Sequence, residues 1–244
     1  RVNRGMQKKT FKSKGLDYVG ELAEKNCKDL EQIVKWNVEN DIYFYRITSS
    51  FLPWHNKYDV EELPNYRKIR EILERVGKIA NENDQRLTFH PGHFVKLASP
   101  TERVAQKAIN ELDTHGKVLD LMGAERSCYN SINIHIGAHY DDKEETGKRF
   151  CKNYGRLSKA AKSRLTVEND DKESLWNVSE LIESVHSEIG IPVVYDRLHH
   201  EFTGRHLSHE EAAKEAFGTW SEKPIMHYSE SRREHGEEDK RAQS

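Results

Sequence analysis

Short apolar runs alternate with amphipathic segments along the whole chain. The runs lie at residues 42–47, 86–90, 132–136, 165–168, 192–196 and 224–228. Each is rich in Val, Ile, Phe or Tyr, which is typical of β-strands. Pro192 and Pro224 open two of the runs, where the missing N–H does least harm to strand pairing. The pattern therefore predicts six strands.

The segments between these runs show helical spacing. Apolar residues recur three or four positions apart over 69–79, 150–161 and 175–189, which places one apolar stripe on one helix face. A longer helix is expected over about 16–36, before the first strand.

Capping signals support these helices. Ser99 followed by Pro100 and Glu102 is typical of a helix start, and Ser208 with Glu211 forms a capping box. Gly190 follows the last periodic residue of its helix and is suited to a left-handed cap. Asp170 and Asp171 are expected to cap a helix that begins near residue 171.

Alternation of strands and helices predicts parallel strands covered by helices. We predict an α/β fold of the TIM (β/α)₈ barrel type, forming a single domain over residues 1–244 whose first and last strands are absent from the chain. The alternative is an open, doubly wound sheet. That fold normally carries a Gly-rich phosphate loop, and neither GxGxxG nor GxxxxGK[ST] occurs in the sequence.

The composition limits the classes of function that are possible. The formal net charge of -2 argues against nucleic-acid binding through bulk charge alone. No apolar run approaches the roughly 20 residues that a membrane span needs, so we expect no membrane association. The three cysteines, Cys27, Cys128 and Cys151, form no CxxC pair, which favours free thiols in a reducing cytoplasm.

Polar residues gather where the predicted strands end. In chain order they are Arg46, His90, His135, Glu168, Asp196 with His199, and His227. Barrel enzymes place their chemistry at these ends. A single such histidine is more often a hydrogen-bonded core residue. Here five successive strands end in His or a carboxylate, and burying so many polar side chains without partners would be costly.

Metal coordination explains this set. Imidazole and carboxylate without thiolate suit manganese, zinc or iron(II). The ligands are too many for one ion, so we expect two or three divalent ions, with Glu168 as the candidate bridge. Paired ions of this kind suit phosphodiester hydrolysis. There is no GxSxG or HExxH motif, and His115, His186 and His209 are interpreted as surface or packing residues of helices.

Six ordered segments carry a family resemblance. They are YRITSSFLPWH (45–55), HPGHF (90–94), NIHIGAHYDDKE (133–144), TVENDD (166–171), VVYDRLHH (193–200) and IMHYSES (225–231). Together with NRGMQKKTF near the start, they make the chain resemble the UV damage endonucleases over nearly its whole length.

The resemblance implies a TIM-barrel, DNA-repair endonuclease. Such an enzyme nicks the backbone immediately 5′ of cyclobutane pyrimidine dimers and 6-4 photoproducts in double-stranded DNA. Manganese is the expected metal, with zinc or magnesium as alternatives. We also expect a monomer that works in the cytoplasm, associated with DNA.

The resemblance also assigns residues. The implied metal ligands are His55, His90, His135, Glu168, Asp196, His199 and His227. Among them, Glu168 and His227 are the expected catalytic residues. His93 and Phe94 match a pair that probes the lesion, where the best-described pattern has Gln and Tyr. At Ile225 some members carry a carboxylated Lys, so that ligand is not expected here.

Two rival functions are also compatible with the sequence. One is a metal-dependent sugar isomerase on the same barrel, which needs a closed polar pocket and no exposed aromatic wedge. The other is a catalytically impaired protein that binds damaged DNA without cutting it. Tight lesion binding without cleavage would distinguish the second from an endonuclease.

Overall fold

The computed structural model describes residues 2–140, 142–204 and 206–230. Asp141 and Ser231, which belong to two of the family-like segments, lie outside these ranges. The chain divides into two compact units. The first comprises residues 1–92, 110–132 and 158–164, and the second comprises 93–109, 133–157 and 165–244.

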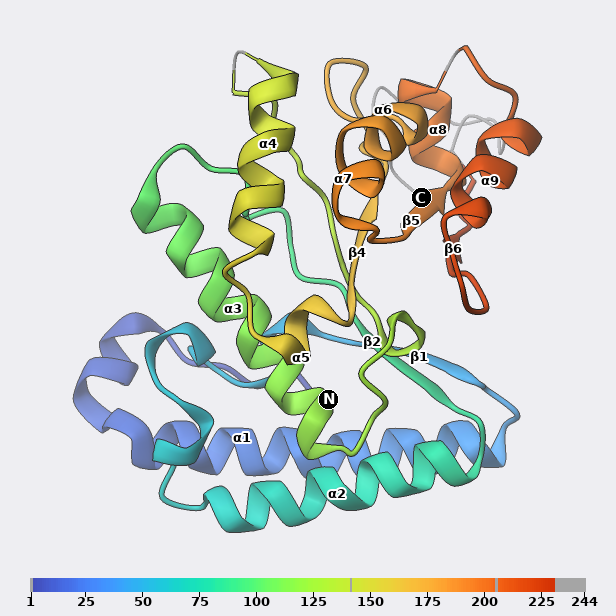
Figure 1. Ribbon diagram of the computed structural model, residues 1–244. Coiled ribbons are helices and arrows are strands. Elements are labelled where there is room, and N and C mark those ends of the chain that lie inside the picture. The colour runs from blue at the N-terminus through green and yellow to red at the C-terminus, as the bar shows by residue number, and fades with distance from the viewer. Residues whose placement is uncertain (1, 141, 205, 231–244) are drawn as a thin grey trace. The chain divides into compact units, whose positions relative to one another are not determined.

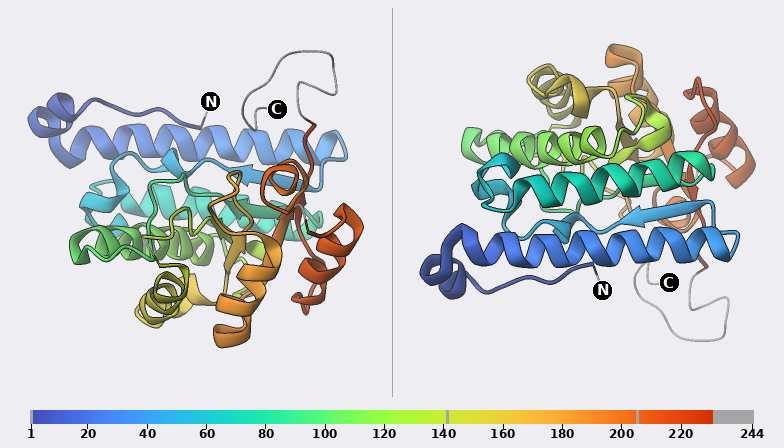
Figure 2. Two further views of the ribbon diagram at one scale, coloured as in Figure 1. Left: turned by 90° about the horizontal axis from the view of Figure 1, so that it is seen from above. Right: turned by 90° about the horizontal axis from the view of Figure 1, so that it is seen from below.

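The first unit is built on two long helices and parallel strand pairs (Figure 1). Its elements are α1 (Lys8–Glu39), β1 (Phe44–Ile47), the 3₁₀ turns Ser49–Phe51, His55–Lys57, Val60–Glu62 and Cys128–Asn130, α2 (Tyr66–Glu82), β2 (Arg86–Phe89) and α5 (Lys159–Lys162). Helices α1 and α2 lie side by side (Figures 1 and 2). Strand β1 pairs with β2 from Phe44 opposite Arg86 to Ile47 opposite Phe89.

Two elements contribute to both units: helix α3 (Glu102–Leu121) and strand β3 (Ile132–Ile134). In the first unit, Phe89 of β2 is in register with Ile132, whose N–H donates to the carbonyl of Arg164 at 2.7 Å. Gly116 lets α3 approach α5 closely, because a Cβ there would lie 2.7 Å from the backbone nitrogen of Ala161.

The second unit contains the remaining strands. Its elements are α4 (Lys143–Tyr154), β4 (Leu165–Glu168), α6 (Val178–Leu181), a π turn (Ile182–His186), α7 (Ser187–Ile189), β5 (Val193–Asp196), α8 (Arg197–Thr203), α9 (His209–Gly218) and β6 (Met226–His227). Val167 pairs with Val193, and Asp196 pairs with His227, both in parallel. Every residue of β4 and β5 is buried.

All six predicted strands occur in the described residues, although most are shorter than expected. The capping box of Ser208 and Glu211 and the left-handed Gly190 are confirmed. The expected single helix over 150–161 is wrong: α4 ends at Tyr154, and Ser158 caps a separate helix by accepting from the N–H of Ala161 at 3.2 Å.

Two further helix boundaries differ from prediction. No helix begins near residue 171; α6 begins at Val178, because Asn177 and Glu180 form its capping box. The first helix is longer than expected and starts at Lys8, with a break at Gly15, whose φ of 60° is non-helical. Glycine adopts that conformation without steric cost.

A buried arginine forms hydrogen bonds to several segments of the first unit. The fully buried side chain of Arg164 donates to Asp120 at 2.8 Å and to four backbone carbonyl groups, those of Gly116, Ala124, Glu125 and Ala160. Burial lowers the pKa of Arg164, and Asp120 opposes this shift.

Arg164→Met is expected to lower the free energy of unfolding by about 3–5 kcal/mol, because it leaves buried acceptors unpaired. Chemical denaturation measures this change. Arg126→Met is the matched control: it removes a mostly exposed partner of the same Asp120, so its effect should be much smaller. Equal effects would show that the buried hydrogen bonds of Arg164 add nothing.

Candidate metal centre

Four strands place polar side chains at one end of the second unit. His135 follows β3, Glu168 ends β4, Asp196 ends β5 and His227 ends β6. The fifth residue, His199, lies in the first turn of α8, where Asp196 caps the helix by accepting from the backbone N–H of His199 at 2.9 Å.

Glu168 is the centre of this group. Its Oε2 lies 3.0 Å from Nδ1 of His227, and its Oε1 lies 3.5 Å from Nδ1 of His199. The same Oε1 is 3.6 Å from Nε2 of His135. Three imidazoles from three separate elements thus face the two oxygens of one carboxylate.

Asp196 adds a second carboxylate to the group. Its Oδ2 lies 3.7 Å from Nδ1 of His227 and 3.9 Å from Nδ1 of His199. Burial raises the pKa of Asp196, and the nearby Glu168 raises it further, whereas His199 lowers it. Two buried carboxylates in one place repel each other, so a cation between them would remove a large electrostatic cost.

Neighbouring side chains fix the orientation of these residues. The amide of Asn133 donates to Oε2 of Glu168, and the hydroxyl of Thr166 donates to Oδ1 of Asn133 at 2.9 Å. Nδ1 of His199 lies 2.9 Å from the carbonyl oxygen of Asn169. This contact fixes the plane of the His199 ring beside the two carboxylates.

Asp170 also belongs to this group, which the sequence did not predict. The expected role as a helix cap is wrong, because the side chain is buried and its Oδ1 lies 3.4 Å from Nδ1 of His135. Burial raises the pKa of Asp170 to about 6. A carboxylate behind an imidazole is a common way of orienting a metal-binding histidine.

The donor set fits divalent transition metals. Carboxylate oxygens and imidazole nitrogens, with no thiolate, are the ligands of manganese, zinc and iron(II). Within the second unit, one triad of Glu168, Asp196 and His199 offers ligand atoms that all lie within 4.8 Å of one another. Five of the seven ligands predicted from the sequence therefore lie in this one group.

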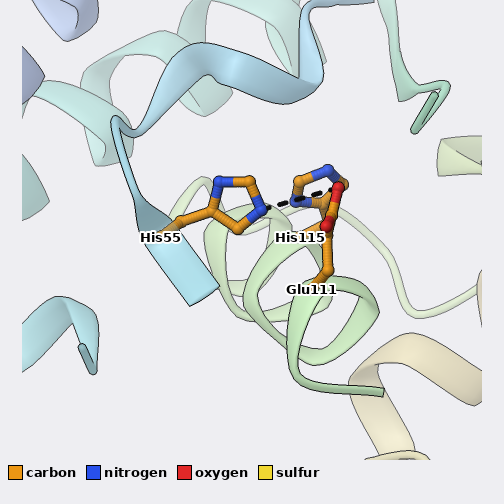
Figure 3. A group of neighbouring side chains, drawn as sticks. All are labelled: His55, Glu111 and His115. Atoms are coloured by element: carbon orange, nitrogen blue, oxygen red, sulfur yellow. Dashed lines mark ion pairs between the residues drawn. The ribbon is translucent and has the colours of Figure 1, made fainter. Parts of the chain in front are cut away.

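The other two predicted ligands lie in the first unit. His90 follows β2, and its Nδ1 lies 3.2 Å from the carbonyl oxygen of Pro91. His55 lies beside His115 and Glu111 of helix α3 (Figure 3). The interpretation of His115 as a packing residue is incomplete: its ring stacks on Phe89 at 4.5 Å but also faces His55.

The predicted lesion-probing pair lies in a turn between β2 and α3. The Phe94 side chain is 81% exposed, so it is not a core residue. Its ring lies 4.0 Å from that of His93. Single exposed apolar side chains are common on protein surfaces, so this exposure shows that the ring is free to contact a partner.

The cysteines take no part in this chemistry. All three are free, as expected from the sequence. Burial raises the pKa of the Cys27 thiol, and it raises that of Cys151 to about 11. Neither thiol is therefore primed as a nucleophile. Among the described residues, no helix is long and apolar enough to span a bilayer.

The chain is similar in sequence to known proteins. A family model described as UV-endonuclease UvdE matches residues 4–244. The chain is 36% identical to the UV-damage endonuclease of Schizosaccharomyces pombe, over 91% of this chain and 38% of that protein. It is 29% identical to the UV DNA damage endonuclease of Clostridium perfringens, over 94% and 55% respectively. The chain thus spans between about two fifths and just over half of the length of these two relatives.

Solved structures give the same result for the fold. The crystal structure of SacUVDE matches with a TM-score of 0.82 and 30% identity, over 95% of this chain and 76% of that one. D-psicose 3-epimerase from Clostridium cellulolyticum H10 reaches a TM-score of 0.56 at 16% identity, over 78% and 65%, which is a likeness of fold alone. The predicted α/β fold of the TIM-barrel type is confirmed, and the chain belongs to the UV-endonuclease UvdE family.

Proposed function

We propose that this protein is a metal-dependent DNA-repair endonuclease that nicks the backbone immediately 5′ of UV photoproducts. The observation that carries the proposal is the group around Glu168, in which two buried carboxylates and three imidazoles face one another. Family membership supplies the substrate class, because the relatives are named for UV damage.

In this proposal, two or three divalent ions, most suitably manganese, would be held by five residues of the second unit: His135, Glu168, Asp196, His199 and His227. His90 is proposed as a further ligand. Bound ions of this kind polarise a phosphate, activate water and neutralise charge on the leaving oxygen. Because the chain itself carries a net charge of -2, such ions would also supply positive charge where the DNA backbone approaches.

The protein residues position these groups. Glu168 would help to hold more than one ion, because its two oxygens face different imidazoles. Its hydrogen bond from Asn133 holds the carboxylate in place before any ion binds. His227 faces both Glu168 and Asp196. We propose that it would hold an ion beside the phosphate that reacts.

The exposed turn is proposed to select damaged DNA. Phe94 can enter the duplex and stack on a base, and His93 supports its ring from the side. A photodimer is easier to unstack than an intact step, so a wedge favours damaged sites. A sugar isomerase on the same barrel needs a closed polar pocket and no aromatic wedge, whereas Phe94 is 81% exposed.

A supercoiled plasmid tests the proposed activity. The protein, loaded with Mn²⁺, is expected to convert UV-irradiated plasmid to the open circular form and to leave unirradiated plasmid intact. A chelator should stop the reaction, because the proposed ions would be removed. Equal nicking of both plasmids, or nicking that persists in excess chelator, would contradict the proposal.

A further inference from the structure

A second cluster of metal-binding side chains lies within the first unit. Glu111 and His115 come from one turn of α3, and His55 comes from the 3₁₀ turn His55–Lys57 (Figure 3). A spacing of four residues places Glu111 and His115 on the same face of their helix. One ligand atom from each of the three residues lies within 4.8 Å of the others.

The geometry of this cluster is poor for hydrogen bonding and good for coordination. Nε2 of His55 lies 3.7 Å from Oε1 of Glu111, which is too long for a hydrogen bond. With metal–ligand bonds of about 2.0–2.2 Å, two atoms of a tetrahedral site lie roughly 3.3–3.6 Å apart. The observed gap is close to that range.

Two buried nitrogens in the cluster have no hydrogen-bond partner. They are Nε2 of His55 and Nε2 of His115, in side chains that are 9% and 3% exposed. Buried polar atoms are nearly always paired, and an unpaired one costs about 1–3 kcal/mol. A metal ion would pair both atoms at once.

The surroundings of His55 prepare it as a ligand. Its Nδ1 lies 3.0 Å from the carbonyl oxygen of Leu52, so Nδ1 carries the proton and Nε2 presents its lone pair to Glu111. The preceding Trp54 has a φ of 58°, in the left-handed region. Its indole N–H donates to the carbonyl of Met6 and its ring stacks on Phe11 at 5.2 Å, which hold this strained backbone in place.

His115 is equally suited to bind a cation. The side chain of His115 is buried, and its Nε2 remains available to a cation. Phe89 stacks on the ring and fixes its plane. Helix packing through Gly116, the next residue, anchors this part of α3 against α5.

We propose that His55, which the family resemblance placed among the other implied metal ligands, instead forms with Glu111 and His115 a separate binding site for one divalent transition-metal ion, with zinc the best-fitting metal. Two imidazoles and one carboxylate make three ligands, and three protein ligands leave a fourth position for water. His55 also lines a polar pocket of about 940 Å³ in the same unit, which can supply that water. The site does not depend on the proposed endonuclease activity.

Zinc binding measured by equilibrium dialysis and elemental analysis tests the site. The experiment uses the Glu168→Gln protein, so that the group in the second unit contributes least. This protein is expected to retain one Zn²⁺ per chain, and adding Glu111→Gln should weaken that binding by at least about 100-fold. Glu102→Gln, at an exposed glutamate of the same helix, is the control and should leave it unchanged.

Thermal unfolding gives a second readout. Saturating Zn²⁺ should raise the melting temperature of the Glu168→Gln protein, and this increase should be absent after Glu111→Gln. Glu111→Ala serves as a second variant should the first unfold. Zinc stoichiometry and melting temperature that do not respond to either change would overturn the proposal and leave the cluster as packing alone, whatever the protein does to DNA.

Discussion

Glu168→Gln is expected to reduce incision of UV-damaged DNA by about 10³-fold or more, a change of roughly 4 kcal/mol in the activation free energy. The reason is geometric and electrostatic. One carboxylate faces His135, His199 and His227, and an amide lacks the charge with which this carboxylate would hold divalent cations. Single-turnover rates with saturating protein measure the effect.

Lesion binding should survive this change, because Glu168 is buried and the proposed DNA wedge lies elsewhere in the sequence. Glu210→Gln is the matched control. It neutralises an exposed glutamate of α9 that pairs with Lys214, and it should incise like the wild-type protein. Wild-type incision by Glu168→Gln would rule out Glu168 as the bridge.

Phe94→Ala is expected to weaken binding to damaged duplex by roughly 5- to 150-fold. A stacked aromatic side chain contributes about 1–3 kcal/mol per base, and each 1.4 kcal/mol is a tenfold change in affinity. The ring is 81% exposed, so little packing is lost with it. Affinity for damaged and undamaged duplex at one salt concentration measures the change.

The loss should be selective for damaged DNA, with metal content unchanged. Phe94→Trp should keep most of the affinity, since it keeps a stacking surface. Tyr43→Ala removes another exposed aromatic ring, 59% exposed, and should change neither affinity. A small and equal loss on both duplexes after Phe94→Ala would mean that the ring has no part in recognition. A loss of metal would mean that the turn only supports His90.

The group around Glu168 could be predicted from the sequence for a simple reason. Parallel strands point their carboxyl ends to the same edge, so the last residues of successive strands meet whatever their distance in the chain. His135, Glu168, Asp196 and His227 each stand at or just after such an end. Recognising the strands was therefore enough to place the donors.

Residues placed by tertiary packing were beyond this reasoning. Asp170 has the sequence of a helix cap, but Asn177 caps the helix instead and Asp170 turns toward His135. Glu111 and His115 have the spacing of a helix face, which by itself fits packing equally well. The position of His55 beside them, which depends on the turn at Trp54, is what distinguishes the proposed metal site from ordinary helix packing.

The helix boundaries that differ from prediction have local causes. Apolar periodicity continues through residues 150–161, yet Ser158 restarts the helix there, because its hydroxyl satisfies an otherwise unpaired N–H. Gly15 interrupts the first helix because it takes a positive φ, a conformation that also ends many helices. Apolar periodicity indicates a buried face, but it does not show whether one helix or two helices form that face.

Cut-site mapping on a duplex with one defined photoproduct tests the central claim most directly. The protein with Mn²⁺ is incubated with duplexes labelled at either end of the damaged strand, and the products are sized and their ends identified. The account predicts one nick immediately 5′ of the photoproduct and none in undamaged duplex. Tight binding without a nick, or a nick at any other position, would contradict it.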